Sequence, residues 1–271
     1  MTIALAERAR AAREIILQES RRANVGHIGS ALSVVDILVA LYSGILRAPA
    51  GQAGERDRFV LSKGHAALAL YALLFDAKTI TREQLSSFCG DDSALGVHPE
   101  HVVPGVDFST GSLGHGLSFG AGAALAARLQ QSPRRAFVLL SDAELNEGSV
   151  WEAAMFAAHH ALANLVAIVD CNGQQAFGYT RDVIDLEPIA GRWRAFGWDV
   201  HEVPGHDAAA LRATLDGLDT ASGRPHVVLA RTTFGCGVSF MERQIKWHYL
   251  PLSDEEFARA LADVRGPASH S

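Results

Sequence analysis

Continuous runs of apolar residues alternate with helical patterns in the middle of the chain. Residues 136–140 read AFVLL and residues 165–169 read LVAIV, and an alanine-rich stretch with a helical pattern lies between them at 151–163. Strands that are apolar on both faces are typical of a parallel sheet that is covered by helices on each side. The order strand, helix, strand therefore predicts a βαβ unit.

Similar patterns extend this unit in both directions along the chain. The helices predicted before it are 4–22, 32–46 with Ser30 as its cap, 66–75 and 117–130. After it, the pattern predicts strands at 198–203 and 227–231, a helix from Asp207 to 218, and a helix at 253–264 that begins with a Ser253–Glu256 capping box. We predict one α/β domain over residues 1–271, with a mostly parallel sheet flanked by helices on both faces, a helical N-terminal segment and a C-terminal tail.

Composition narrows the classes of function that the chain can have. Of its 271 residues 48% are hydrophobic, the net charge is -6 and there is no block of basic residues, which argues against a general nucleic-acid binder. No run approaches the roughly 20 apolar residues of a membrane span, and the charged first residues do not resemble a signal peptide. Three cysteines without CxxC spacing suit a reducing compartment. We expect a cytoplasmic protein that binds neither nucleic acid nor membrane.

Two polar loops follow the central strands. Asp142 comes after the first strand and Asn172 after the second, and ligands of parallel sheets bind beyond the carboxyl ends of the strands. Carboxylate and amide oxygens suit Mg²⁺ or Ca²⁺ and do not form a zinc site. Ser141 and Ala143 are small enough to let a diphosphate approach the backbone amides. An Asp after a strand is often only a turn former, so the prediction depends on both loops lying at one edge of the sheet.

Six segments of the sequence carry a family resemblance. From Asp142 to Asn172, which are 30 positions apart, SDAELNEG…VDCNG resembles the thiamine-diphosphate motif. Five further segments, in the same order as in the family, resemble the N-terminal half of transketolases: NVGHIG at 24–29, LSKGH at 61–65, GVHPE at 96–100, STGSLGHG at 109–116 and WH at 247–248. The resemblance covers nearly the whole chain, from about residue 9 to residue 257. It implies the thiamine-diphosphate-binding fold.

The resemblance also implies thiamine diphosphate as cofactor, together with Mg²⁺, for which Ca²⁺ can substitute. The metal ligands that it implies are Asp142, Asn172 and the carbonyl of Gln174. The cofactor-binding residues that it implies are His65, Gly111, Ser112, Leu113, Asp142, Ala143 and Asn172. The catalytic residues that it implies are His27, His98 and His248, which would surround the reactive carbon and bind the hydroxyls of the donor sugar, and Glu147, near the subunit interface.

The resemblance ends with the first domain of such an enzyme. Enzymes of this type build each site between two domains, and the second domain contributes the glutamate that activates the aminopyrimidine. We therefore expect a C-terminal, pyrimidine-binding subunit on another chain and a two-fold symmetric heterotetramer. The implied reaction is transfer of a two-carbon ketol unit from a ketose or ketose phosphate donor to an aldose acceptor.

Three alternatives stay open at this point. One is another thiamine-diphosphate enzyme, either similar to deoxyxylulose-phosphate synthase or decarboxylating 2-oxo acids, although GVHPE and WH favour transketolase. Another is a non-catalytic regulatory subunit, because Ser141 and Ala143 replace two glycines of the motif. A metal hydrolase has no support from zinc-type spacing. Tyr249, where relatives usually have glycine, adds bulk near the expected donor site.

Overall fold

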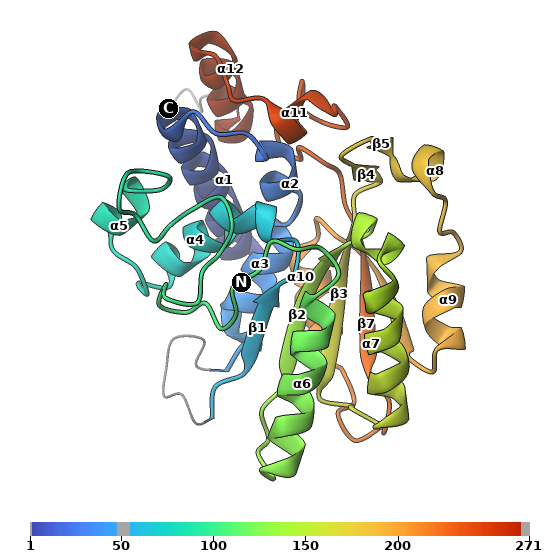
Figure 1. Cartoon of the computed structure of the whole chain (residues 1–271). Helices are drawn as coiled ribbons and strands as arrows, with labels where there is room; N and C mark the ends of the chain where they lie inside the picture. Colours follow the sequence, from blue (N-terminus) through green and yellow to red (C-terminus); the bar gives the residue numbers. More distant parts are fainter. Residues whose placement is uncertain (1, 48–54, 267–271) are drawn as a thin grey trace.

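A parallel sheet forms the centre of the molecule (Figure 1). The computed structural model describes residues 2–47 and 55–266, so the predicted domain of 1–271 includes residues 1, 48–54 and 267–271, which lie outside the described ones. Within the described residues the sheet has five parallel strands in the order β1-β2-β3-β7-β6. Their bounds are β1 (Arg58–Leu61), β2 (Ala136–Ser141), β3 (Leu165–Cys171), β6 (Asp199–Pro204) and β7 (His226–Arg231). The predicted mostly parallel sheet is confirmed.

Both faces of the sheet are covered, as the continuous apolar strands predict. Alternate side chains enter two separate cores, because successive residues of a strand point to opposite faces. Phe137, Val166 and Val228 belong to one core, which includes residues of α1, α2, α3, α4 and α10. Val138 and Leu229 belong to the other, which is covered by α6, α7 and α9. The bounds of these helices are α1 (Thr2–Ala23), α2 (Ile28–Ser33), α3 (Val35–Ala40), α4 (Ala67–Asp76), α6 (Gly116–Leu129), α7 (Gly148–His159), α9 (Ile189–Ala195) and α10 (Ala208–Asp216).

The helix predicted at 32–46 is wrong in its bounds. The structure has α2 from Ile28, α3 after a break at Val34, and a π-helical turn η1 (Leu41–Ile45). Ser30 lies inside α2 and does not cap it; His27, with a φ of 61°, precedes the first turn. The residues of α2 and α3 are all buried, so this segment has no polar face whose period could mark where each helix begins.

Several short elements were not predicted, because each of them is too short to show a period in its apolar residues. They are α5 (Arg82–Ser86), the antiparallel pair β4 (Gln174–Gln175) and β5 (Gly178–Tyr179), α8 (Thr180–Val183), α9 and α11 (Lys246–Tyr249). Short 3-10 turns, η2 (Gly64–Ala66) and η3 (Ala143–Asn146), follow β1 and β2. The Asp207 cap of α10 and the Ser253–Glu256 capping box of α12 (Asp254–Arg265) are confirmed. Within the described part of the chain, no helix has the length and hydrophobicity to cross a membrane.

Candidate functional site

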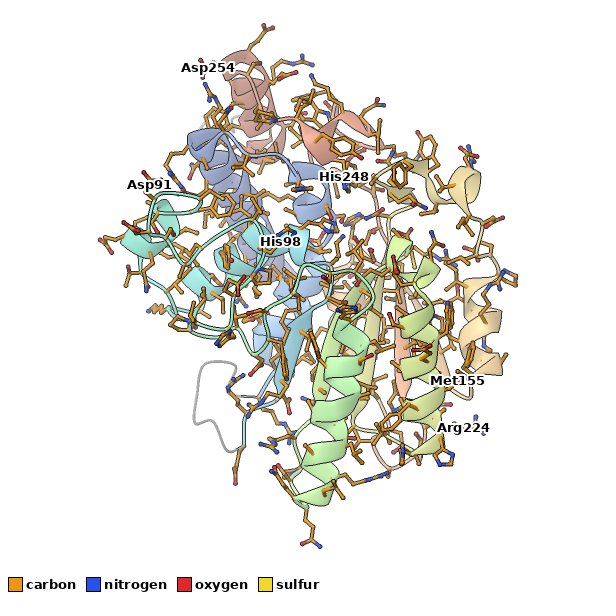
Figure 2. All side chains as sticks on the ribbon, viewed as in Figure 1. Asp91, His98, Met155, Arg224, His248 and Asp254 are labelled. Atoms are coloured by element: carbon orange, nitrogen blue, oxygen red, sulfur yellow. The ribbon has the colours of Figure 1, made fainter. Side chains whose placement is uncertain are left out.

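A cavity of about 310 Å³ lies where the carboxyl ends of β1, β2, β3 and β7 meet. Most of the residues predicted for the site line it: His27, His65, His98, Gly111, Leu113, Ala143, Glu147, Asn172, Gln174 and His248. His98 and His248 both lie toward the upper end of the sheet in Figure 2. Two predicted residues do not line the cavity: Ser112 is exposed, and Asp142 is buried behind its wall.

Three histidines from distant parts of the chain form a cluster in this cavity. The ring centres of His27, His65 and His248 are 5.2–5.6 Å apart. His27 takes the left-handed backbone conformation, which is uncommon for residues other than glycine, and its N–H donates to the carbonyl of His248 at 3.3 Å. The fold thus holds an unfavourable backbone conformation where it brings two predicted catalytic residues together.

Burial keeps these imidazoles uncharged. It lowers the pKa of His27, with a smaller effect from His98, and it lowers the pKa of His65 well below its ordinary value, with a smaller effect from Lys63. Burial, and secondarily His27, lowers the pKa of His248 to about 4. At neutral pH each ring is therefore neutral and offers one hydrogen-bond donor and one acceptor.

Buried polar atoms without a hydrogen-bond partner gather in the walls of the cavity. Among the residues that the structure describes, these atoms are His27 Nδ1, Ser30 Oγ, Asn146 Oδ1, Gln174 Oε1, Gln175 Nε2 and His248 Nδ1. A buried polar atom without a partner costs about 1–3 kcal/mol of stability, so native proteins have few of them. Their concentration in one cavity indicates a site for a polar ligand, and sequence reasoning did not identify Ser30, Asn146 or Gln175 as part of it.

Asp142 and Asn172 lie at the ends of the paired strands β2 and β3. Asp142 accepts hydrogen bonds from the N–H groups of Gly173 at 2.7 Å and Ala143 at 2.9 Å, and Asn172 Oδ1 accepts from the N–H of Gln174 at 2.9 Å. Burial, and then the charge of Asp170, raises the pKa of Asp142 to about 7. Within the described residues Asp142 has no ion-pair partner. A buried carboxylate in this situation gains from a nearby cation, which fits the predicted metal site.

Lys63 and Asp170 form a buried ion pair beside the cavity that the sequence analysis did not identify. Asp170 also accepts hydrogen bonds from Ser33, Thr232 and the side-chain amide of Asn172. Burial opposes ionisation of Asp170, but the charge of Lys63 outweighs it and lowers the pKa of the carboxyl. The bond to Asn172 fixes its amide so that the oxygen is directed away from Asp170. The sequence did contain a signal for this ion pair, because a charged residue stands at the end of each of two apolar strands, in LSK at 61–63 and in VDC at 169–171. Buried charges need partners, so two such residues of opposite charge predict a pair.

The loop at 109–114 lies close to the turn after β1. A Cβ atom at Gly64 would lie 2.9 Å from the backbone nitrogen of Gly111, so the backbones touch there. Buried Glu144 fixes the other side of the loop by accepting hydrogen bonds from Gly114 N–H at 2.9 Å and from the hydroxyl of Ser62 at 2.6 Å. These contacts place Gly111 and Leu113 in the wall of the cavity.

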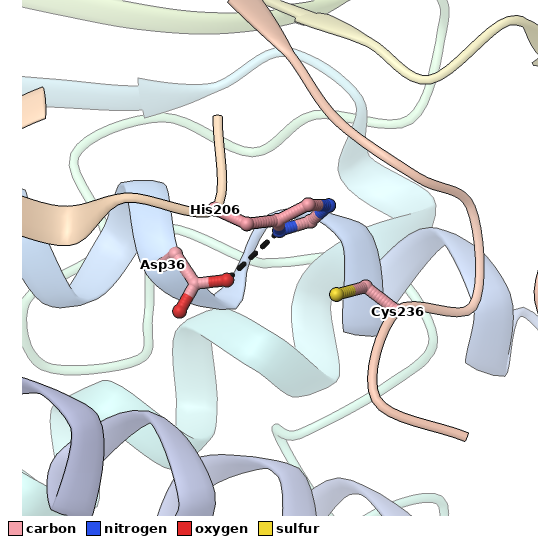
Figure 3. Close-up of side chains that lie close together, drawn as sticks. All are labelled: Asp36, His206 and Cys236. Carbon is pink, nitrogen blue, oxygen red and sulfur yellow. Dashed lines mark hydrogen bonds and ion pairs between the residues drawn. The ribbon is translucent and has the colours of Figure 1, made fainter. Parts of the chain in front are cut away.

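A second polar cluster contains Asp36, His206 and Cys236 (Figure 3). The residue types suit a metal site, but the contacts do not. His206 Nδ1 is bonded to Asp36 at 2.9 Å, and its Nε2 accepts the N–H of Thr233 at 2.7 Å, so both ring nitrogens are occupied. The guanidinium of Arg13 pairs with Asp36 and lies 3.7 Å from the sulfur of Cys236. Arg13 therefore already supplies the cation of this cluster.

Comparison with known proteins adds to this geometry. Residues 5–264 match the family model described as transketolase, thiamine diphosphate binding domain. The chain is 42% identical to one subunit of the apulose-4-phosphate transketolase of Phocaeicola vulgatus, over 90% of this chain and 87% of the relative. It is 37% identical to 6-deoxy-6-sulfo-D-fructose transketolase subunit SqwG of a Clostridium species, over 97% of this chain and 96% of the relative.

Solved transketolases have the same fold. The crystal structure of transketolase from Campylobacter jejuni superposes with a TM-score of 0.90 at 30% identity, over 98% of this chain and 43% of that chain. Transketolase from Leishmania mexicana gives a TM-score of 0.88 at 30% identity, over 96% of this chain and 41% of that chain. This chain thus spans about two fifths of the length of these enzymes. The chain belongs to the transketolase family and, as its sequence predicts, corresponds to the N-terminal, thiamine-diphosphate-binding part of that enzyme.

Proposed function

We propose that this chain is the diphosphate-binding subunit of a split transketolase and works with a separate pyrimidine-binding subunit. The pair transfers a two-carbon ketol unit from a ketose or ketose phosphate to an aldose. The observation that carries this proposal is the cavity at the carboxyl edge of the sheet, where the motif residues meet and buried polar atoms lack partners. Relatives that are named as single subunits of transketolases, and that match over most of their own length, support the split arrangement.

Asp142, Asn172 and the carbonyl of Gln174 are the proposed ligands of Mg²⁺, for which Ca²⁺ can substitute. The raised pKa of Asp142 supports this role, because a cation favours the charged carboxylate that burial disfavours. Lys63 supports it indirectly, since it neutralises Asp170 and leaves Asp142 as the carboxylate available to a metal ion. Oxygen ligands of these types are those that Mg²⁺ prefers.

The cofactor's diphosphate is proposed to lie against Ala143 and His65, with the aminopyrimidine at the backbone of Gly111, Ser112 and Leu113. Ala143 N–H is bonded to Asp142 in the structure, and metal binding by that carboxylate would leave the N–H available to a diphosphate oxygen. When bound, thiamine diphosphate supplies the carbon nucleophile and the electron sink for the transfer.

His27, His98 and His248 are the proposed catalytic residues of this chain. The rings of His27 and His248 are neutral and each has a buried Nδ1 without a partner, so they can bind hydroxyls of the donor sugar. A donor ring placed beside the substrate oxygen on which charge develops stabilises the transition state. Glu147 is exposed at the start of α7 and also lines the cavity, which suits its proposed position at the subunit interface.

The second subunit is proposed to supply the glutamate that activates the aminopyrimidine, and two copies of each chain are proposed to form a heterotetramer in the cytoplasm. The test is two-carbon transfer from hydroxypyruvate or a ketose phosphate, with Mg²⁺ and thiamine diphosphate, by the chain alone and by the chain co-expressed with a C-terminal transketolase subunit. We expect activity only in the pair. Use of pyruvate in place of ketoses would favour another enzyme of this cofactor class, and a stable pair that binds no cofactor would favour a regulatory subunit.

A further inference from the structure

The side chain of Asp170, near the end of β3, receives hydrogen bonds from four segments of the chain. One carboxylate oxygen accepts from the hydroxyl of Ser33 at 2.7 Å and from the amine of Lys63 at 2.5 Å. The same oxygen accepts from the side-chain amide of Asn172 at 2.8 Å, and the hydroxyl of Thr232 donates to the other oxygen. The donors lie in α2, in the turn after β1, directly after β3 and directly after β7. We call Asp170 and these four donors the Asp170 network.

The side-chain amide of Asn172 is held at both of its ends by this arrangement. Its nitrogen donates to Asp170, and its oxygen accepts the N–H of Gln174 at 2.9 Å. Rotation of the amide by half a turn would place its oxygen against the carboxylate and its NH₂ group against another N–H donor. Both contacts would be repulsive, so the contacts permit one orientation of the amide. In that orientation Oδ1 keeps a second lone pair, which a metal ion can use.

The main chain of Asp170 positions the other proposed side-chain ligand of the metal. The N–H of Asp142 donates to the carbonyl of Asp170 at 3.2 Å, and Ser141 pairs with Asp170 in the ladder between β2 and β3. Asp142 and Asn172 therefore leave the sheet at the same level, one after each strand. A substitution of Asp170 keeps this main-chain bond, so it tests the side chain alone.

The orientation of Asn172 is set within this chain. Ser33, Lys63 and Asp170 are fully buried, and Asn172 is 8% exposed. A second subunit that covers the cavity does not reach the carboxylate of Asp170 and adds no donor to it. Lys63 supplies the countercharge that a buried carboxylate needs, and a charged acceptor forms a stronger hydrogen bond than a neutral one.

From these contacts we infer that Asp170 is a positioning residue of the proposed metal site, whose side chain holds the amide of Asn172 with its oxygen presented to the metal ion. This inference rests on the proposed function and deepens it. Groups that only orient a metal ligand typically contribute about 10–100-fold to metal affinity. The Asp170 network also joins four segments of the fold, so the test has to separate the orientation of Asn172 from stability.

The experiment compares two charge-balanced variants of the chain in complex with its second subunit. Lys63→Met/Asp170→Leu removes the ion pair and both acceptor oxygens, whereas Lys63→Met/Asp170→Asn removes the same charges and keeps one acceptor oxygen for Asn172. Neither variant leaves a buried charge without its partner. Calorimetric titration with Mg²⁺ at saturating thiamine diphosphate should show roughly 10–100-fold weaker Mg²⁺ binding in the leucine variant than in the asparagine variant.

Two further measurements separate positioning from a structural role. Ser33→Ala removes one donor to Asp170 but leaves the bond to Asn172, so it should keep the Mg²⁺ affinity within about twofold of wild type even though it lowers stability. In the leucine variant, kcat at saturating Mg²⁺ should approach that of the asparagine variant, because the defect lies in holding the metal ion. Lys63→Met/Asp170→Ala lacks the same oxygens with less bulk and gives the same comparison if the leucine variant does not assemble.

Equal Mg²⁺ affinity in the two double variants would overturn the inference. A loss of the same size in Ser33→Ala would also overturn it, because the Asp170 network would then act only by holding the fold together. If the wild-type complex binds no thiamine diphosphate in the presence of Mg²⁺, the proposed function itself fails, and this result differs from both of the others.

Discussion

Asp36 and Asp142 are both buried carboxylates, yet their pKa values shift in opposite directions. Burial opposes ionisation of Asp36, but the hydrogen bond from His206 and the charge of Arg13 outweigh it and lower the pKa. Burial and Asp170 raise the pKa of Asp142 to about 7. The cluster around Asp36 is closed by its own protein contacts, whereas the set around Asp142 lies beside a cavity with unpaired polar atoms. The cluster around Asp36, which we call the closed cluster, stabilises the fold through bonds that are already made. Asp142 and the cavity residues with unpaired polar atoms, which we call the open set, have groups that a ligand can bind.

Judged by residue types alone, the cluster around Asp36 would be the metal site and the residues around Asp142 would not. Aspartate, histidine and cysteine within 4.8 Å of one another form a more familiar metal-ligand set than one aspartate and one asparagine. The occupied ring nitrogens of His206 and the guanidinium of Arg13 decide against a metal there. The contacts that are already made identify a ligand site better than the residue types do.

Asp142→Asn should have the largest effect, on cofactor binding. Mg²⁺-dependent binding of thiamine diphosphate should weaken by more than roughly 100-fold, because even residues that only orient metal ligands contribute 10–100-fold. Calorimetry of the complex measures this, and retained binding would remove Asp142 from the metal site.

The metal-free variant should also be at least as stable as wild type at pH 8. The raised pKa means that the metal-free wild type loses stability as the pH rises from near 3.8 to about 7, and Asn removes this loss.

Asp36→Asn should instead act on stability, since it leaves Arg13 buried without its countercharge. We expect the free energy of unfolding at pH 7 to fall by about 3 kcal/mol, measured with urea, while cofactor binding by the folded complex is unchanged. Because the pKa of Asp36 is lowered, its stabilising effect is present above its ordinary value of 3.8 and lost as the pH falls through the lowered one. The difference from wild type should therefore shrink near pH 3. Asp76→Asn, in a more exposed pair with Arg8, is the control and should cost less than about 1 kcal/mol.

His27→Ala should distinguish a catalytic role from a role in cofactor binding among the residues of the open set. Turnover of the complex should fall roughly 100-fold, the scale of a residue that assists proton transfer, while affinity for thiamine diphosphate changes little. Steady-state kinetics and cofactor titration of the same preparation measure the two effects. His159→Ala, at an exposed histidine of α7, should change neither. An unchanged turnover for His27→Ala would exclude it from the catalytic residues.

How much of the fold the sequence predicts depends on whether an element is determined by its own residues or by contacts with distant residues. The strands β2, β3 and β7 are continuous apolar runs with few alternatives, so their positions were predicted within one or two residues. The segment of α2 and α3 is also apolar, but its breaks depend on tertiary contacts, such as the bond from His27 N–H to His248, more than 200 residues away. The β4–β5 hairpin has no apolar period at all and forms where Gln174 and Tyr179 reach Arg243.

The site residues divide in the same way, into those that the sequence identifies and those that only the fold identifies. His27, His65, His98 and His248 were predicted because each stands in a segment that resembles the family, and the fold does bring them to one cavity. Lys63 stood in one of those segments without a role, because its partner Asp170 lies 107 positions away and only the fold shows the pair. Ser30 was assigned as a helix cap, since a hydroxyl beside a helical pattern usually is one.

Two serines of α2 provide the smallest and most closely matched test. Ser33 and Ser30 are both fully buried and lie one turn apart, but the hydroxyl of Ser33 donates to Asp170 at 2.7 Å, whereas that of Ser30 has no partner and lines the cavity. Ser33→Ala should lower the free energy of unfolding by about 1–2 kcal/mol, because Asp170 loses a donor. Ser30→Ala should leave the metal-free chain within about 0.5 kcal/mol of wild type, since no bond is lost and an unpaired group is removed.

If the open set binds a polar ligand, Ser30→Ala should instead weaken cofactor or substrate binding by the complex a few-fold, measured by calorimetry. An equal loss of stability in both variants would mean that Ser30 is already satisfied in the free chain, and the contrast between the closed and open sets would not extend to this helix.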